Sequence, residues 1–127
     1  ALKGVEVSVG VYNNKEEIIA LPVTEIVSEN EFFDYEAKYL GKSQEITPAR
    51  ISDKETEMVQ KEAIRIYKLL NMKGLTRSEF IIQKGKPYFI EINTNPGLST
   101  ESIVPKQARS AGMTLTDFFD ILIQNVL

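Results

Sequence analysis

The chain has 127 residues, a formal net charge of −3 and 43% hydrophobic residues, and it contains neither cysteine nor histidine. This length allows one domain with a buried core. The missing cysteines exclude disulfides, a thiol nucleophile and zinc–cysteine sites, and the missing histidines exclude a Ser-His-Asp triad and histidine metal ligands. The small negative charge does not favour nucleic acid or an anionic membrane, and no apolar run is long enough to span a bilayer.

The first part of the chain predicts a strand pair followed by a long loop. Apolar and polar residues alternate from Val5 to Tyr12, as in a half-buried strand. Residues 18–27 form the expected return strand, in which Pro22 indicates a sheet edge or a bulge. Residues 28–50 are polar and rich in turn formers, which is typical of a lid over a binding site. The aromatic cluster in this loop fits an adenine site or a small satellite core.

Three segments predict helices. The first begins at a capping box in residues 52–55 and continues to about Leu70. Residues 103–111, closed by Gly112, form a second helix, and residues 114–126 form the third. The buried stripe of the first helix is expected to consist of Val59, Ala63, Ile66 and Leu70. The apolar side of the third is expected to pack in the core and consists of Leu115, Phe118, Phe119, Leu122, Ile123 and Val126.

Residues 76–83 and 87–93 predict a β-hairpin, and residues 84–86 predict its turn. Gly85 supplies the positive φ that a short hairpin turn needs, so the turn is centred on this glycine and the pairing register follows from it. One face of the hairpin is apolar and is expected to face the core. Its members are Phe80, Ile82, Tyr88, Ile90 and Ile92.

The other face of this hairpin gathers polar side chains. The register places Glu79 opposite Glu91 and Arg77 opposite Asn93. Two carboxylates that face each other repel, so Arg77 and a hard divalent cation are expected to neutralise them. Carboxylate and amide oxygens, with no sulfur or imidazole, suit Mg²⁺ or Mn²⁺. The alternative is a solvated face on which Arg77 forms an ordinary ion pair with a glutamate.

The loop after the hairpin, residues 93–102, contains a turn signal at Asn95-Pro96-Gly97. Ser102 suits the N-cap of a helix that starts near Ile103. A helix N-terminus surrounded by hydroxyl groups binds anions readily, and it would lie close to the predicted metal. A capped loop without a ligand fits the composition equally well.

Four motifs together resemble the D-alanine:D-alanine ligases of the ATP-grasp superfamily: DYEAKY at 34–39, RSEF at 77–80, EINTNPG at 91–97 and SIVP at 102–105. The resemblance covers nearly the whole chain. It implies an α+β fold for residues 1–127, with an antiparallel sheet packed on helices as in the C-terminal subdomain of the ATP-grasp fold. The chain is expected to be a fragment of a longer ligase and to be inactive alone.

The resemblance implies an ATP-dependent ligase that joins two D-alanines for peptidoglycan synthesis in the cytoplasm. ATP would phosphorylate the carboxylate of the first substrate, and the amine of the second would attack the acyl phosphate. The expected partners are ATP, D-alanine and the remaining domains of the parent ligase, with a homodimer as one option for the parent. The alternatives are a ligase that joins D-alanine with D-lactate or D-serine, a nucleotide-binding module without ligation, and a structural domain that binds neither metal nor nucleotide.

The resemblance also implies ligand-binding residues. Glu79, Glu91 and Asn93 would hold Mg²⁺ or Mn²⁺. Glu6 would bind the ribose hydroxyls of ATP, although from the residue alone an exposed strand glutamate is preferred, and Lys38 would contact the phosphates. The family commonly has aspartate where this chain has Glu79. The additional methylene makes the metal geometry, and occupancy by a second metal, an open point.

Two further pairs of residues would act on the reacting groups. In the resembled family, the positions of Arg77 and of the Gly97 backbone N–H stabilise the tetrahedral oxyanion. The positions of Ser102 and of the Ile103 backbone bind the carboxylate of the second substrate.

Overall fold

The computed structural model describes residues 4–28, 43–99 and 102–125. Its described strands form one antiparallel sheet in the order β4-β3-β1-β5-β6, and β2 also pairs with β1. The strands are β1 (Val5–Asn14), β2 (Glu17–Ala20), β3 (Thr24–Ser28), β4 (Ser43–Ile46), β5 (Thr76–Gln83) and β6 (Lys86–Asn93). The helices are α2 (Asp53–Leu69), α3 (Ile103–Ser110) and α4 (Leu115–Gln124). The predicted α+β fold, an antiparallel sheet packed on helices, is confirmed.

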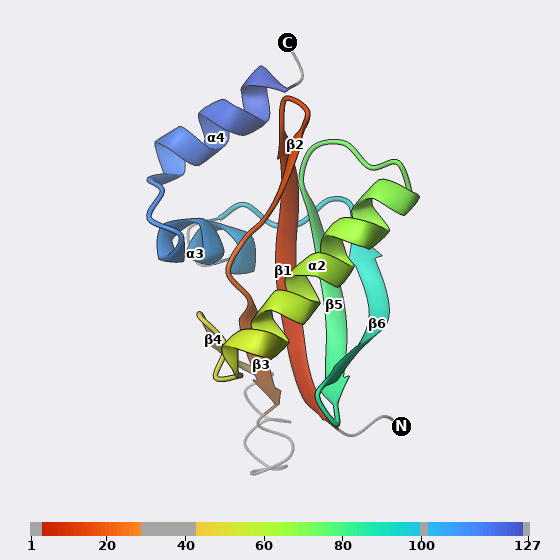
Figure 1. Cartoon of the computed structure of the whole chain (residues 1–127). Coiled ribbons are helices and arrows are strands. Elements are labelled where there is room, and N and C mark those ends of the chain that lie inside the picture. The colour runs from red at the N-terminus through yellow and green to blue at the C-terminus, as the bar shows by residue number, and fades with distance from the viewer. Residues whose placement is uncertain (1–3, 29–42, 100–101, 126–127) are drawn as a thin grey trace.

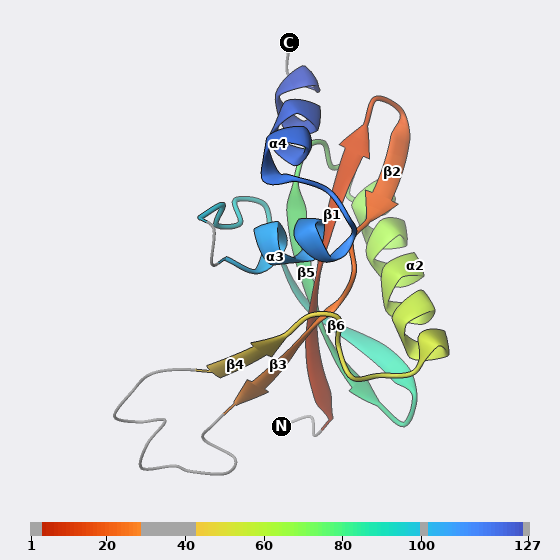
Figure 2. The same cartoon turned by 90° about the vertical axis from the view of Figure 1, so that its left-hand side faces the viewer.

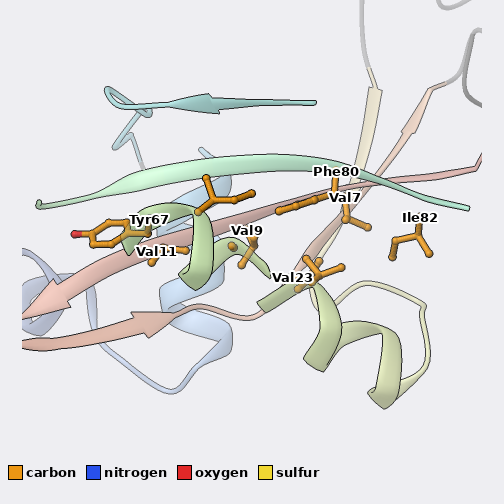
Figure 3. Packing of buried hydrophobic residues seen from close by; sticks show 10 residues of the cluster. Val7, Val9, Val11, Val23, Tyr67, Phe80 and Ile82 are labelled. Atoms are coloured by element: carbon orange, nitrogen blue, oxygen red, sulfur yellow. The ribbon is translucent and has the colours of Figure 1, made fainter. Parts of the chain in front are cut away.

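The sheet separates two layers of helices: α2 covers one face, whereas α3 and α4 lie on the other (Figures 1 and 2). Alternation along β1 sends its valines towards α2, where Val7, Val9 and Val11 meet Val59 and Tyr67 in one cluster. Figure 3 shows this cluster with Phe80 and Ile82. A second cluster forms under α3 and α4 and contains Tyr12, Leu21, Val104, Ala108 and Phe118.

The strand predictions need three corrections. The first strand is not half-buried, because the second helical layer also buries its polar face at Ser8 and Tyr12. The return strand is two strands, β2 and β3, and the interruption falls at Leu21–Val23, where Pro22 lacks the N–H that a ladder needs. The predicted loop also contains β4, which pairs with β3. Residues 29–42 of that loop lie outside the described residues.

The helix predictions are largely confirmed. Both hydrogen bonds of the predicted capping box are present at the start of α2. Val59, Ala63 and Ile66 are buried as predicted, but Leu70 is 47% exposed and Tyr67 is an additional core residue. Tyr67 lies one helical turn after Ala63, and its hydroxyl donates to the carbonyl of Gly74 at 2.6 Å, so burying it leaves no polar group unpaired. In α4, Ile123 is 52% exposed, contrary to the prediction.

No described helix combines the length and apolar character that a membrane crossing needs.

Candidate functional site

The β5–β6 hairpin has the predicted register where the site residues lie. Arg77 pairs with Asn93 and Glu79 pairs with Glu91. Directly paired residues of an antiparallel ladder share a face, so these four side chains lie on one side of the sheet. The faces follow from β1, because Gly10 pairs with Arg77 and Ser8 with Glu79, which places the four on the side that carries α3 and α4.

Nearer the turn, the predicted register and apolar face are wrong. The turn has two residues, Lys84 and Gly85, with φ of 52° and 76°. Pairing then shifts between Glu79 and Phe80, so that Phe80 pairs with Phe89. This β-bulge leaves Ile90 as the extra residue of β6. In consequence Tyr88 and Ile90 are each 44% exposed, whereas Phe80 and Ile82 are buried as predicted.

An ion pair and a facing carboxylate act on Glu79 in opposite directions. Arg77 Nη2 donates to Glu79 Oε1 at 3.1 Å, and the two side chains are only 20% and 15% exposed. Burial raises the pKa of the Glu79 carboxyl, and the facing Glu91 carboxylate raises it further, while Arg77 opposes both. The pKa of Glu79 is raised overall, so Arg77 does not fully offset the effects of burial and of the facing Glu91 carboxylate.

The oxygen ligands of this face fit a hard divalent cation. Glu79 and Glu91 supply carboxylates, and Asn93 supplies an amide oxygen. Asn93 Oδ1 accepts a hydrogen bond from the Asn95 N–H at 2.8 Å, which leaves its second lone pair for a cation. A cation would also relieve the repulsion that raises the pKa of Glu79. Within the described ranges no three acidic, histidine or cysteine residues form a metal cluster, so further ligands would have to come from a bound phosphate or water.

The two residues expected to bind ATP differ in what the structure says about them. Glu6 pairs with Ile81, two residues along the ladder from Glu79, so it lies on the same face as the carboxylates. It is half-buried rather than fully exposed. Lys38 lies outside the described residues.

The N-terminus of α3 lies against the loop that carries Gly97. Ser102 is the N-cap, but its side chain forms no capping hydrogen bond. Instead, Ser102 Oγ lies 2.7 Å from Ser99 Oγ, and a Cβ at Gly97 would lie 3.0 Å from the same oxygen. The first N–H groups of a helix have no partners within it, so this end of α3 can bind an anion. Ile103, the first residue of α3, is buried.

Sequence reasoning missed the buried polar residues Ser8, Thr24 and Gln107 on this side of the sheet. Gln107 of α3 is completely buried and hydrogen-bonds to β1. Ser8 is completely buried beside Glu79, and its Oγ has no partner among the described residues. The sequence signal for Gln107 is its position between the apolar Val104 and Ala108, which would have placed it on the buried side of α3.

Comparisons with known proteins show the family to which this chain belongs. Residues 1–124 match the family described as D-ala D-ala ligase C-terminus. A D-alanine–D-alanine ligase from Christiangramia forsetii is 63% identical over 99% of this chain and 39% of its own length. One from Porphyromonas gingivalis is 47% identical over 98% of this chain and 38% of its own length. The chain thus spans less than two-fifths of these relatives.

Solved structures give the same result. The VanG D-Ala:D-Ser ligase from Enterococcus faecalis superimposes with a TM-score of 0.87 and 32% identity, covering 100% of this chain and 37% of that one. A D-alanine–D-alanine ligase from Bacillus anthracis, complexed with ATP, has a TM-score of 0.80 and 26% identity over 98% of this chain and 38% of its own. The chain therefore belongs to the D-ala D-ala ligase C-terminus family.

Proposed function

We propose that this chain is the C-terminal part of an ATP-dependent ligase that joins two D-alanines through an acyl phosphate, for peptidoglycan synthesis in the cytoplasm, where ATP is supplied. The observation that carries the proposal is the shared face of Arg77, Glu79, Glu91 and Asn93, on the side of the sheet that also carries α3. The identity of 63% to a D-alanine–D-alanine ligase supports this choice of substrates.

Each polar group on this face has a proposed task. Arg77 donates one hydrogen bond to Glu79, and its buried Nε has no partner among the described residues. Arg77 therefore has a spare donor for the oxyanion that forms when the amine attacks the acyl phosphate. The Gly97 N–H is proposed as the second donor. Ser102 and the Ile103 N–H are proposed to bind the carboxylate of the second D-alanine at the start of α3.

A divalent cation, Mg²⁺ or Mn²⁺, is proposed to be held by Glu79, Glu91 and Asn93. When bound, it would supply positive charge beside the ATP phosphates. Glu6, on the same face, is proposed to accept hydrogen bonds from the ribose hydroxyls, and Lys38 to contact the phosphates. The remaining domains of the parent ligase would supply the opposite wall of the nucleotide site.

The charge of Glu91 provides the first test. In the full-length parent, Glu91→Gln should abolish most ligation and leave the thermal unfolding midpoint nearly unchanged. Glutamine keeps the size and one acceptor oxygen but loses the charge that would hold the cation. Glu57→Gln, at an exposed position on α2, is the matched control and should keep full activity. Full ligation by Glu91→Gln at ordinary Mg²⁺ concentration would refute the metal assignment.

Arg77 provides the second test, because its proposed partner exists only near the transition state. Arg77→Ala should lower kcat more than it raises the KM for ATP. The loss of one oxyanion donor costs roughly 3 kcal/mol, or about a hundredfold in rate. If the variant lost only thermal stability and kept its kcat, Arg77 would be simply the ion-pair partner of Glu79.

The VanG ligase, with a TM-score of 0.87, supports D-serine as an alternative second substrate. Product analysis with D-alanine alone, and with D-alanine plus D-serine or D-lactate, separates these functions. The proposal expects D-alanyl-D-alanine as the main product at equal substrate concentrations. If a mixed product predominated, the second substrate would be D-serine or D-lactate instead of D-alanine. If the parent bound ATP but formed no product, it would be a nucleotide-binding module without ligase activity.

A further inference from the structure

The ladder on one side of β1 is interrupted at its centre. Leu21–Val23 bend away between β2 and β3, although the Leu21 N–H still donates to the Gly10 carbonyl at 2.8 Å. Gly10 falls in the gap between the β2 pairing, which ends at Val11, and the β3 pairing, which begins at Ser8. Gly10 is buried, and a buried backbone N–H without a partner is costly.

The side-chain amide of Gln107 fills this gap. Its Oε1 accepts from the Gly10 N–H at 2.9 Å, and its Nε2 donates to the Ser8 carbonyl at 2.8 Å. The second Nε2 hydrogen is directed to Thr24 Oγ1 at 3.0 Å. Thr24 Oγ1 lies in turn 2.6 Å from Thr47 Oγ1. The amide thus uses its oxygen as an acceptor and both of its N–H groups as donors.

Glycine at position 10 makes this approach possible. A Cβ there would lie 3.0 Å from Gln107 Oε1, 2.9 Å from Leu21 Cδ1 and 3.4 Å from Val104 Cγ2. The α3 helix can therefore come close enough to β1 for side-chain hydrogen bonds only because this residue has no side chain.

These bonds determine where the N-terminus of α3 lies. Val104 and Ala108 hold the helix by apolar packing, which tolerates small sliding movements. The hydrogen bonds of Gln107 are directional and allow one position of the helix relative to β1. Gln107 lies four residues, or about 6 Å along the axis, from Ile103. A displacement of Gln107 therefore also displaces the N–H groups at the start of α3.

We propose that Gln107 is a positioning residue for the second substrate: by completing the β1 ladder, it fixes α3 at the height at which Ser102 and the Ile103 N–H receive the substrate carboxylate. This inference rests on the proposed ligase function. Gln107 itself touches β1 and β3 rather than a substrate.

The test compares Gln107→Leu with wild type in the full-length parent ligase. Leucine is of similar size but removes the hydrogen bonds to the Gly10 N–H and the Ser8 carbonyl, so the buried Gly10 N–H loses its side-chain partner. We expect the KM for the second D-alanine to rise about tenfold, since a small misplacement of binding groups is costly, while the KM for ATP stays within about twofold. A milder variant, Thr24→Val, removes one of the three bonds and should raise the same KM by a smaller factor.

A matched control separates positioning from general loss of stability. Val59→Ala destabilises the α2 cluster on the opposite face and should lower the unfolding midpoint while leaving both KM values within about twofold. An unchanged KM for the second D-alanine in Gln107→Leu, or an equal rise of both KM values, would overturn the inference. The proposed function is judged separately, because a wild-type parent that forms no dipeptide refutes it before any variant is compared.

Hydrogen exchange on the 127-residue chain gives a readout that needs no substrate. In Gln107→Leu, exchange should accelerate at Gly10 and along α3, whereas α2 should exchange as in wild type. Unchanged exchange at Gly10 and in α3 would show that the amide does not hold the helix, and the inference would fail even in an active ligase.

Discussion

Two glutamates in this chain carry opposite pKa shifts for physical reasons that the structure makes explicit. The Arg50 guanidinium donates to both carboxylate oxygens of Glu25, at 3.1 and 3.0 Å, and these side-chain bonds lower the pKa of Glu25 despite its burial. Burial raises the pKa of Glu79, and the nearby Arg77 does not reverse this. The ionised Glu25 carboxylate thus stabilises the fold, whereas the ionised Glu79 carboxylate reduces the stability, as is common for functional groups.

Glu25→Gln should reduce stability mainly at neutral pH. A carboxyl with a lowered folded pKa stabilises the protein above the ordinary glutamate value of 4.5 and loses this contribution as the pH falls through the folded pKa. Because Arg50 is 65% exposed, solvent screens the pair, and we expect a loss of about 1 kcal/mol at neutral pH. Urea unfolding between about pH 3 and pH 7 measures the difference, which should shrink as the pH falls. A constant difference would contradict the ion-pair explanation.

Glu79→Gln should show the opposite dependence on pH. A carboxyl with a raised folded pKa favours the fold most in its protonated form, below the ordinary glutamate value, and this advantage is lost as the pH rises through the folded pKa. The stability of wild type relative to Glu79→Gln should therefore fall from acid to neutral pH in the same urea series. If it rose instead, Arg77 would dominate the environment of Glu79, and the case for a cation would weaken.

For single residues, the sequence predicted the pairing of Glu79 with Glu91 but not the contact of Gln107 with Gly10. The register of Glu79 against Glu91 was predicted correctly from Gly85, but only because a β-bulge offsets the error in the predicted turn. The role of Gln107 could not be predicted, because its partner Gly10 lies 97 residues away and the gap in the ladder exists only in the folded sheet. Lys38 stays a prediction, as do the roles of the other site residues.

Among the elements, the β5–β6 hairpin shows how turn chemistry controls the site. Both turn residues, Lys84 and Gly85, have positive φ, which is the geometry of a type I′ turn and matches the twist of the strands. The two-residue turn sets the pairing of Gln83 with Lys86, and the bulge then restores the register that aligns Glu79 with Glu91. The predicted register at the carboxylates was therefore correct although the predicted turn was one residue too long.

Gly85→Ala should destabilise the chain by about 1 kcal/mol because alanine is strained at positive φ. A Cβ there would meet nothing within 4 Å, so the effect would come from the backbone alone. Lys84→Asn should be neutral or stabilise slightly, since asparagine accepts the left-handed region. Urea midpoints of the two variants test this pair. Equal destabilisation by both would mean that side-chain contacts, and not backbone conformation, hold the turn.

The elements that the sequence missed depend on tertiary contacts. β4 lies in a polar stretch without strand periodicity and becomes a strand because β3 offers it an edge. The bulge at Ile90 lies in β6, at the edge of the described sheet, and the exposure of Tyr88 follows from the register that the bulge creates; no local pattern reveals either. The capping box of α2, by contrast, is a local signal and was predicted correctly.

In the whole molecule, β1 lies between two hydrophobic clusters, one under α2 and one under α3 and α4. Its valines pack under α2, and Tyr12 packs under α4, where its ring lies 5.3 Å from that of Phe118 at a right angle. The face that holds α3 and α4 also carries the site residues of the hairpin. The α2 core therefore provides a rigid base, while α3 and the hairpin present their polar groups on the other side.

This arrangement predicts that the 127-residue chain alone binds ATP·Mg²⁺ weakly and does not ligate D-alanine. The proposed nucleotide face carries Glu6, Glu79 and Glu91 against Arg77, so it repels the phosphates unless a cation lies between them. Two carboxylates and one amide are few ligands for Mg²⁺, and the chain spans only 39% of its relative from Christiangramia forsetii. We expect a Kd above about 100 μM by calorimetry.

The full-length parent, measured in the same buffer, is the control and should bind at least tenfold more tightly, in keeping with about 1.4 kcal/mol or more from the second wall. Replacing Mg²⁺ with Mn²⁺ should not rescue the short chain, because the missing contacts go to the nucleotide rather than to the cation. Tight binding by the short chain would mean that the described face already forms a complete nucleotide site, and the upstream domains would then serve the D-alanine substrates alone.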